Sequence, residues 1–295
     1  MTERSVLPTV APLLFVAIWS TGWIAGRFAA LDGDPLTFLA VRFAAAIVVL
    51  TPICVVLGAH FPKGPAAIGH ALVSGVLLHA LYLGGVWWAI AHGVPAGLSA
   101  VIAALQPLMT ATLAPRLAGE HIGARRMTGF VIGFLGIAIV VSPRLLGLDA
   151  ATLTTAAVPL CVNVAAMGAV TLGTFHQKAR VTSGHLLAVA VLQYVGALVV
   201  MLPLAWATET MRFDVNLRSM LTLGWSVIGL SIGAIALLLH LIRCGEVSRA
   251  ASLIYLVPPA AVVQAWLFFG ETLNFLQVFG MVVTAIGVAL ANRSG

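Results

Sequence analysis

Ten apolar segments, each about long enough to cross a lipid bilayer, follow one another along the chain with only short polar links between them. A helix needs about 20 apolar residues to cross a hydrocarbon core about 30 Å thick. We expect spans at residues 8–30, 35–57, 68–91, 95–117, 126–141, 152–174, 186–207, 221–242, 250–269 and 275–291. The pattern predicts an all-α integral membrane protein with ten transmembrane helices.

The charge content agrees with a chain that lies mostly in lipid. Charged residues make up 8% of the 295 residues and hydrophobic residues 61%, whereas a soluble domain carries about 25% charged side chains. This excludes a soluble enzyme, a nucleic-acid binder and a disulfide-stapled secreted domain. Cys54, Cys161 and Cys244 are isolated, without the spacing of a metal site. We expect the bilayer as partner, with no nucleic acid, metal or cofactor.

The basic residues indicate the orientation in the membrane, because cytoplasmic links are rich in Lys and Arg. If the N-terminus is cytoplasmic, the outer links and helix ends hold Arg27, Arg144, Arg212 and Arg218. The inner links and tails then hold Arg4, Lys63, Arg116, Arg125, Arg126, Lys178, Arg180, Arg243, Arg249 and Arg293. We therefore expect a multi-pass protein of the bacterial inner membrane with both termini in the cytoplasm.

An internal repeat divides the chain into two halves. Residues separated by 151 positions match as Pro107/Pro258, Gly119/Gly270, Glu120/Glu271, Gly129/Gly280 and Gly136/Gly287. Each half holds an odd number of spans, so the second half must insert upside down relative to the first, as in many secondary transporters. We expect two inverted five-helix repeats, residues 1–147 and 148–295, in one membrane domain.

Three stretches of the sequence resemble a known family. The run AIWSTGWIAGR (17–27) and the two repeat ends, LQPLMTATLAPRLAGEHI (105–122) and LVPPAAVVQAWLFFGETL (256–273), are similar to EamA-type proteins of the drug/metabolite transporter superfamily. Within that superfamily the chain looks most like YddG-type aromatic amino acid exporters. The resemblance covers essentially the whole chain. It implies ten helices, both termini inside, and export of small metabolites by alternating access around a cavity lined by the third, fourth, eighth and ninth helices.

No acidic residue falls at mid-membrane. Most lie in links or tails, and Glu120 and Glu271 lie at the ends of the fourth and ninth spans. We expect these two to accept backbone N–H groups at the start of the following helix. Without a carboxylate at depth, the sequence predicts a facilitator, or coupling through another group. It also predicts no catalytic residue, and therefore no enzyme.

Arg42 is the one basic residue expected well inside a span. It lies about seven residues into the second span, about 10 Å below the outer surface at about 1.5 Å per residue. Its counterpart in the second repeat is Gln193. Because a charge within the membrane is costly, Arg42 either holds a substrate carboxylate or serves the structure by holding a backbone carbonyl.

Other polar and aromatic side chains complete the candidate site. His79 and Tyr82 share one face of the third span at a depth that points to the cavity or to a hydrogen bond with another helix. Trp19 is a further candidate, while Trp23, Trp87 and Trp88 fit either the cavity or an aromatic belt at the outer interface.

Paired prolines point to the same region. Pro107 in the fourth span and Pro258 with Pro259 in the ninth remove backbone N–H groups, so we expect hinges there and free carbonyls at Ala103, Ile254 and Tyr255. Interrupted helices at matching positions are a pointer to a transporter's binding site, although kinks can also serve packing alone. The polar side chains expected near this level are Gln106, Asn163, Tyr255 and Gln264.

Taken together, these features predict a carrier of small metabolites, in particular amino acids, aromatic ones included. The alternative within the superfamily is an exporter of drug-like or other metabolites. A membrane-embedded enzyme is a more distant alternative, since no catalytic constellation is present.

Overall fold

A computed structural model describes residues 7–118, 123–146, 150–234, 237 and 256–292. The first repeat contains α1 (Leu7–Asp32), α2 (Pro35–Val56), α3 (Pro65–Gly75), η1 (Val76–Leu81), α4 (Tyr82–Ala91), α5 (Ala96–Ile102), α6 (Leu105–Ala118) and α7 (Ala124–Leu145). The second contains α8 (Ala150–Arg180), α9 (Leu186–Thr208), α10 (Leu217–Gly224), η2 (Trp225–Ala234), α13 (Val257–Phe269) and α14 (Phe275–Asn292). The fold is an all-α membrane protein.

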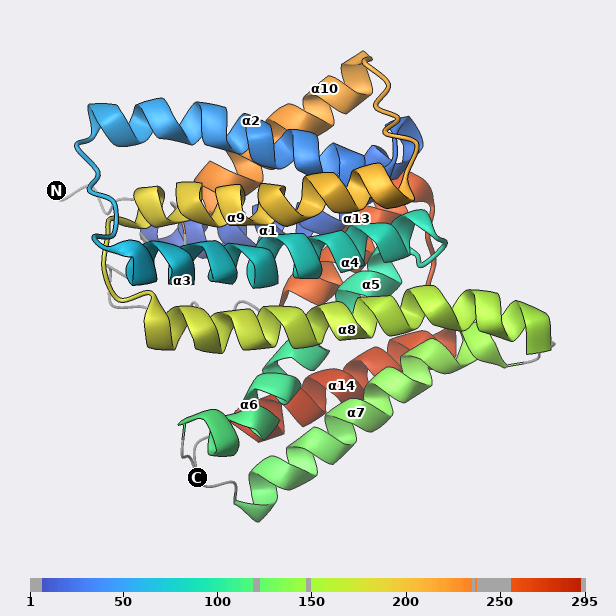
Figure 1. Cartoon of the computed structure of the whole chain (residues 1–295). Helices are drawn as coiled ribbons and strands as arrows, with labels where there is room; N and C mark the ends of the chain where they lie inside the picture. The colour runs from blue at the N-terminus through green and yellow to red at the C-terminus, as the bar shows by residue number, and fades with distance from the viewer. Residues whose placement is uncertain (1–6, 119–122, 147–149, 235–236, 238–255, 293–295) are drawn as a thin grey trace, which may run out of the picture.

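The helices correspond in order to the expected spans. Within the described ranges, five are long and apolar enough to cross a membrane: 13–32, 35–56, 65–91, 155–180 and 186–208. The other five positions carry shorter apolar helices at 96–110, 127–143, 217–233, 257–269 and 275–290. The long helices lie side by side, and α7 and α14 form a separate pair along one side (Figure 1).

Local sequence sets many of the helix ends. Pro35 and Pro65 occupy first turns, where a missing N–H costs nothing. Asn216 and Ser219 form a reciprocal capping box at the start of α10. Gly270 ends α13 with a φ of 66°, a left-handed conformation that glycine adopts without strain.

The crossing of α7 and α14 displays the relation between the repeats. A side-chain carbon at Gly136 would collide with the backbone of Gly280 and Thr284, and one at Gly287 would collide with Gly133 and Gly129. Gly280 and Gly287 are the counterparts, 151 residues on, of Gly129 and Gly136. Gly136 therefore meets Gly280, the counterpart of Gly129, and Gly287, the counterpart of Gly136, meets Gly129. This exchange is expected for two equivalent helices related by a two-fold axis.

Two segments depart from α-helix in a way that the sequence did not predict. The third span contains the π-helix η1 between α3 and α4, and the eighth contains the π-helix η2 after α10. Shifted by 151 positions, η1 falls within η2. π-Helical turns are rare and concentrate at functional sites, so their matching positions mark this level of both repeats.

Candidate functional site

A buried polar cluster lies where η1 meets α2 and α9. We call Arg42, Ser74, His79, Gln193 and Tyr194 the His79 cluster. The His79 ring stacks on Tyr194 with centroids 4.7 Å apart, and the Gln193 amide donates to the Ser74 hydroxyl at 2.9 Å. Gln193 also lies within hydrogen-bonding reach of His79. Gln193, the repeat counterpart of Arg42, thus lies beside His79, and Arg42 lies on α2, which packs against α9.

Arg42 is buried, and no described acid forms an ion pair with it. Its side chain is 5% exposed, its guanidinium carbon lies 5.5 Å from the centre of the Trp87 ring, and its Nε has no hydrogen-bond partner among the described residues. An aromatic face offsets part of the desolvation cost of a cation. The other N–H groups of the Arg42 guanidinium can donate to an anionic group, since guanidinium binds a carboxylate through two parallel hydrogen bonds.

The described carboxylates lie at or beside helix ends, whereas Arg42 lies inside α2. They are Asp32, Asp34, Glu209, Asp214 and Glu271. Asp32 pairs with Arg218 at the start of α10, and Asp34 accepts from Thr210 and Arg212. None of these acids is available to neutralise Arg42.

A second set of polar contacts joins α1, α5, α8 and α13. Asn163, fully buried on α8, donates to the Ser99 hydroxyl at 2.7 Å. Gln264 on α13 donates to the Ala17 carbonyl at 3.0 Å. The other amide oxygens, Oδ1 of Asn163 and Oε1 of Gln264, are buried with no partner in the described part of the chain. These atoms can accept hydrogen bonds from a ligand or from water.

The remaining candidates are distributed around these two sets. Tyr82 begins α4, one residue after η1, and packs against the core. Trp19 on α1 is 36% exposed and packs on Phe15 at 5.3 Å. Gln106 lies in the first turn of α6, and Tyr255 lies outside the described residues.

The burial of the other tryptophans decides between the two interpretations. Trp23 is 5% exposed and Trp87 is 1% exposed. An aromatic belt faces the lipid interface, so that interpretation is wrong for both. The sequence could not show which face of the helix turns inward.

The break in the fourth span differs from the expected proline kink. α5 ends at Ile102, a turn follows at Ala103 and Ala104, and α6 begins at Leu105, so Pro107 lies just after the break. The expectation of a free carbonyl at Ala103 is wrong, because this oxygen accepts the Gln106 N–H at 3.1 Å. Pro258 and Pro259 lie in the first turn of α13, and the carbonyls of Ile254 and Tyr255 fall outside the described residues.

Glu271 has the expected kind of role but serves a different helix. Its two carboxylate oxygens accept the N–H groups of Ala96 and Gly97 at 3.1 and 3.0 Å, at the start of α5 and not of the following helix α14. The sequence could not show this because the two segments are distant along the chain. Its counterpart Glu120 lies outside the described residues.

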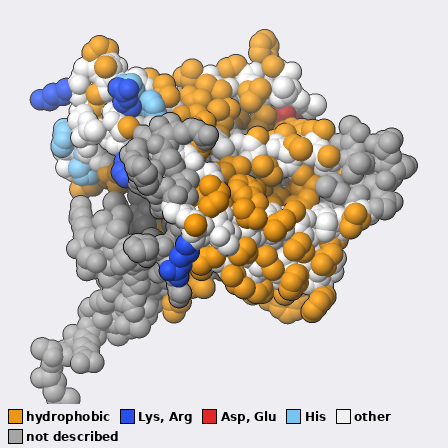
Figure 2. Space-filling view, turned by 90° about the horizontal axis from the view of Figure 1, so that it is seen from below, with side chains coloured by type: hydrophobic (Ala, Val, Ile, Leu, Met, Phe, Trp, Pro, Cys, Tyr) orange, Lys and Arg blue, Asp and Glu red, His pale blue; other side chains and the backbone are white. Residues whose placement is uncertain are grey.

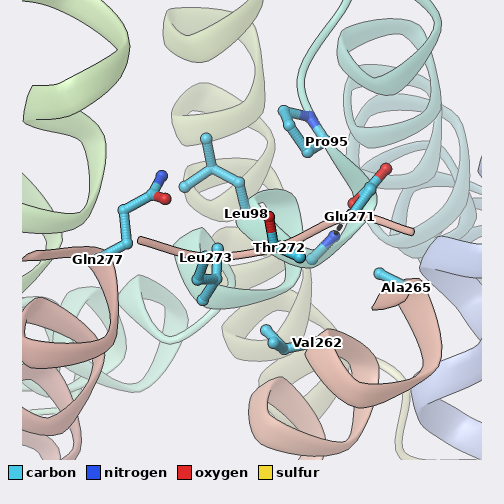
Figure 3. Close-up of a pocket in the computed structure, with 9 residues that line it drawn as sticks. Pro95, Leu98, Val262, Ala265, Glu271, Thr272, Leu273 and Gln277 are labelled. Atoms are coloured by element: carbon cyan, nitrogen blue, oxygen red, sulfur yellow. Dashed lines mark hydrogen bonds between the residues drawn. The ribbon is translucent and has the colours of Figure 1, made fainter. Parts of the chain in front are cut away.

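A small cavity of about 170 Å³ lies beside this cap. Figure 3 shows it between Pro95 and Leu98 of the α5 region, Val262 and Ala265 of α13, and Gln277 of α14. It brings together none of the site residues predicted from the sequence. Both oxygens of its one acid, Glu271, are used by the α5 start, so the cavity belongs to the packing of this helix end.

Comparison with known proteins agrees with this architecture. Residues 9–142 and 157–293 match the model of the EamA-like transporter family; the repeat boundary at residue 147 stays a prediction. The "Uncharacterized inner membrane transporter YedA" of Escherichia coli K12 is 27% identical over 98% of this chain and 92% of its own. The "Uncharacterized transporter YvbV" of Bacillus subtilis 168 is 25% identical over 94% of this chain and 88% of its own.

This chain is also similar to a named efflux protein and to a solved structure. A "Probable amino-acid metabolite efflux pump" of E. coli K12 is 23% identical over 95% of this chain and 92% of its own. A solved crystal structure of another protein superposes with a TM-score of 0.63 at 16% identity, covering 97% of this chain and 96% of that one. At this identity the superposition shows the fold alone.

Proposed function

Because the chain belongs to the EamA-like transporter family, and is thus a multi-pass inner-membrane transporter and not an enzyme, we propose that it exports amino acids, aromatic ones included, by alternating access. The observation that carries the proposal is the buried guanidinium of Arg42, which no described acid neutralises. A substrate carboxylate would supply the missing counter-charge. The amino-acid efflux named for one relative supports the same substrate class.

The proposed site combines a charged part with an aromatic part. Arg42 would bind the carboxylate, while His79 and Tyr82 would contact the rest of the substrate. The ring centre of Phe43 lies 6.1 Å from that of His79 and 5.8 Å from that of Tyr194, so His79 has two aromatic neighbours of the kind that pack favourably with an aromatic side chain. Trp19, Gln106, Asn163, Tyr255 and Gln264 remain further candidates for substrate contact.

The proposed movement uses the interruptions in both repeats. π-Helical turns concentrate at functional sites, so η1 and η2 join the turn before Pro107 and the Pro258–Pro259 pair as hinge positions. Rocking of the repeats about the α2–α9 crossing would then expose the His79 cluster to each side in turn.

Counterflow in proteoliposomes with a panel of labelled amino acids tests this proposal. We expect exchange by the wild type and a loss of about tenfold or more in His79→Ala and Tyr82→Ala. His92→Ala is the matched control, because His92 lies at the end of α4, exposed and stacked on Trp88, and should transport normally. Absence of exchange with every amino acid would overturn the substrate class. Normal exchange by both variants would overturn the site.

The coupling and the topology are separate parts of the proposal. Without a carboxylate at depth among the described residues, we propose facilitated exchange, or coupling through another group; accumulation driven by a pH gradient that only Glu120 or Glu271 substitutions abolish would contradict this. We also propose that both termini are cytoplasmic. A C-terminal alkaline phosphatase fusion, active only outside the cytoplasm, should then be inactive.

The superfamily alternative is an exporter of drug-like or other metabolites. An exporter of cations would need an acid or an aromatic cage at the site, and the described site presents a cation in Arg42. If a cationic drug inhibited counterflow and no amino acid did so, this alternative would be favoured.

A further inference from the structure

The described acidic side chains all lie at one end of the bundle, together with Arg212 and Arg218. Asp32, Asp34, Glu209, Asp214 and Glu271 lie at the end that holds the links after α1, α9 and α13. The opposite end, which we call the basic end, holds the links after α2 and α8. Its residues are His60, Lys63, His70, His176, Lys178, Arg180 and His185.

Several elements meet at the basic end. The rings of His70 on α3 and His176 on α8 lie 5.2 Å apart. The rings of His60 and His185 lie 6.4 Å apart, and the His185 N–H donates to the His60 carbonyl at 2.8 Å. The histidines of α3 and α8 therefore form one pair, and those of the α2–α3 link and the start of α9 form another.

This end contains no described counter-charge. The sequence from 35 to 208 has only Glu120 and Asp149 as acids, and both lie outside the described residues. Lys63, Lys178 and Arg180 are exposed. Nε2 of His176 is buried without a hydrogen-bond partner in the described part of the chain. The cluster thus offers several donors and, among described side chains, no carboxylate to occupy them.

We propose that the basic end binds the phosphate headgroup of an anionic phospholipid. Lys and Arg recognise phosphate through charge-assisted hydrogen bonds, and basic clusters at span ends bind acidic headgroups. Figure 2 shows Lys, Arg and His side chains gathered toward one end of the molecule, with a broad hydrophobic surface beyond them. Phosphate recognition and acyl-chain contact can therefore occur side by side.

The position of the basic end favours a lipid over a soluble anion. Its residues lie at the ends of the spans 65–91, 155–180 and 186–208, at the depth of the headgroups. Exposed apolar side chains lie on the same helices, with Val73 on α3, Leu172 on α8 and Leu186 on α9. Acyl chains can cover these side chains while the phosphate contacts the basic end.

Binding of phosphatidylglycerol by the full-length protein, followed by native mass spectrometry with phosphatidylcholine as reference, tests the proposal. We expect phosphatidylglycerol to bind more tightly than phosphatidylcholine, and binding to weaken about fivefold for each charge removed in Lys178→Gln and Arg180→Gln. Arg125→Gln is the matched control: Arg125 is an exposed residue of α7 outside the cluster, and its loss should leave this binding unchanged.

Each outcome bears on the proposal. Equal binding of the two lipids would overturn it, as would an equal loss in Arg125→Gln and Arg180→Gln. Competition by inorganic phosphate as strong as that by phosphatidylglycerol would indicate a soluble anion and would also overturn it. Transport is not part of this readout, so its result is independent of the proposed substrate.

Discussion

Glu209 caps the helix in which Thr37 lies. Its carboxylate accepts the Thr37 N–H at 2.7 Å and the Thr37 hydroxyl at 2.8 Å, and its other oxygen accepts the Leu36 N–H at 2.9 Å. The first N–H groups of a helix lack partners within it, and a carboxylate there also interacts favourably with the helix dipole. The end of α9 thereby fixes the start of α2, across the boundary between the repeats.

Replacing Glu209 by alanine should lower the stability of the protein. Three hydrogen bonds to a charged acceptor are lost, and we expect a cost of about 2–3 kcal/mol in the free energy of unfolding, measured as a lower thermal unfolding temperature in detergent. The control is Asp214→Asn, which breaks a 3.7 Å ion pair with Arg212 between half-exposed side chains and should change little. Equal melting of wild type and Glu209→Ala would contradict the capping role.

The pair formed by Asp32 and Arg218 should show coupling in a double-mutant cycle. Arg218 donates to both oxygens of Asp32, at 2.7 and 2.6 Å; the acid is 2% exposed and the arginine 50%. Because water screens the half-exposed arginine, we expect Arg218→Gln to lower the thermal unfolding temperature only modestly. In the Asp32→Asn background, Arg218→Gln should lower the stability of the protein clearly less. Additive effects of the two substitutions would show that the pair contributes no coupling.

Asp34 should make stability depend on pH in the acid range. Burial raises the pKa of this carboxyl, but hydrogen bonds from the Arg212 N–H and from the Thr210 hydroxyl and N–H outweigh it and leave the pKa below its ordinary value. A lowered folded-state pKa means that this stabilisation is present above the unfolded pKa, about 3.9, and is lost as pH falls through the folded value. Melting temperatures from pH 7 to 3 should therefore fall less in Asp34→Asn than in the wild type. A parallel fall in both would refute the assignment.

The sequence predicted the membrane fold well because lipid limits the choices. A span must be apolar and helical over a fixed length, so composition and run length suffice to find it. The 151-residue repeat then predicted which helices are equivalent. The contacts of Gly136 with Gly280 and of Gly287 with Gly129 follow this equivalence of α7 and α14. The matching positions of η1 and η2 follow the same repeat, but no residue pattern announces a π-helix.

The candidate site was less accessible, because its contacts join residues distant in sequence. The pattern identified Arg42, its counterpart Gln193 and His79 separately, yet only the packing of α2, η1 and α9 shows that they form one cluster. Tyr194, on which His79 stacks, was missed, although it directly follows Gln193 in the sequence. The helix that Glu271 caps was predicted wrongly for the same reason, since local sequence favours the next helix as the partner.

The glycines allow a test of the close crossing of α7 and α14. Gly287→Ala places a methyl group against the backbone of Gly133 and Gly129, which must move apart, so the two helices lose packing and the unfolding temperature should fall. Gly168→Ala in α8 is the matched control. A side-chain carbon there meets no atom within 4 Å, and alanine favours helix over glycine by up to about 1 kcal/mol, so stability should stay equal or rise. Gly136 faces Gly280 as its repeat counterpart Gly287 faces Gly129, so a two-fold crossing predicts that Gly136→Ala destabilises as Gly287→Ala does. A silent Gly136→Ala beside a damaging Gly287→Ala would contradict that symmetry.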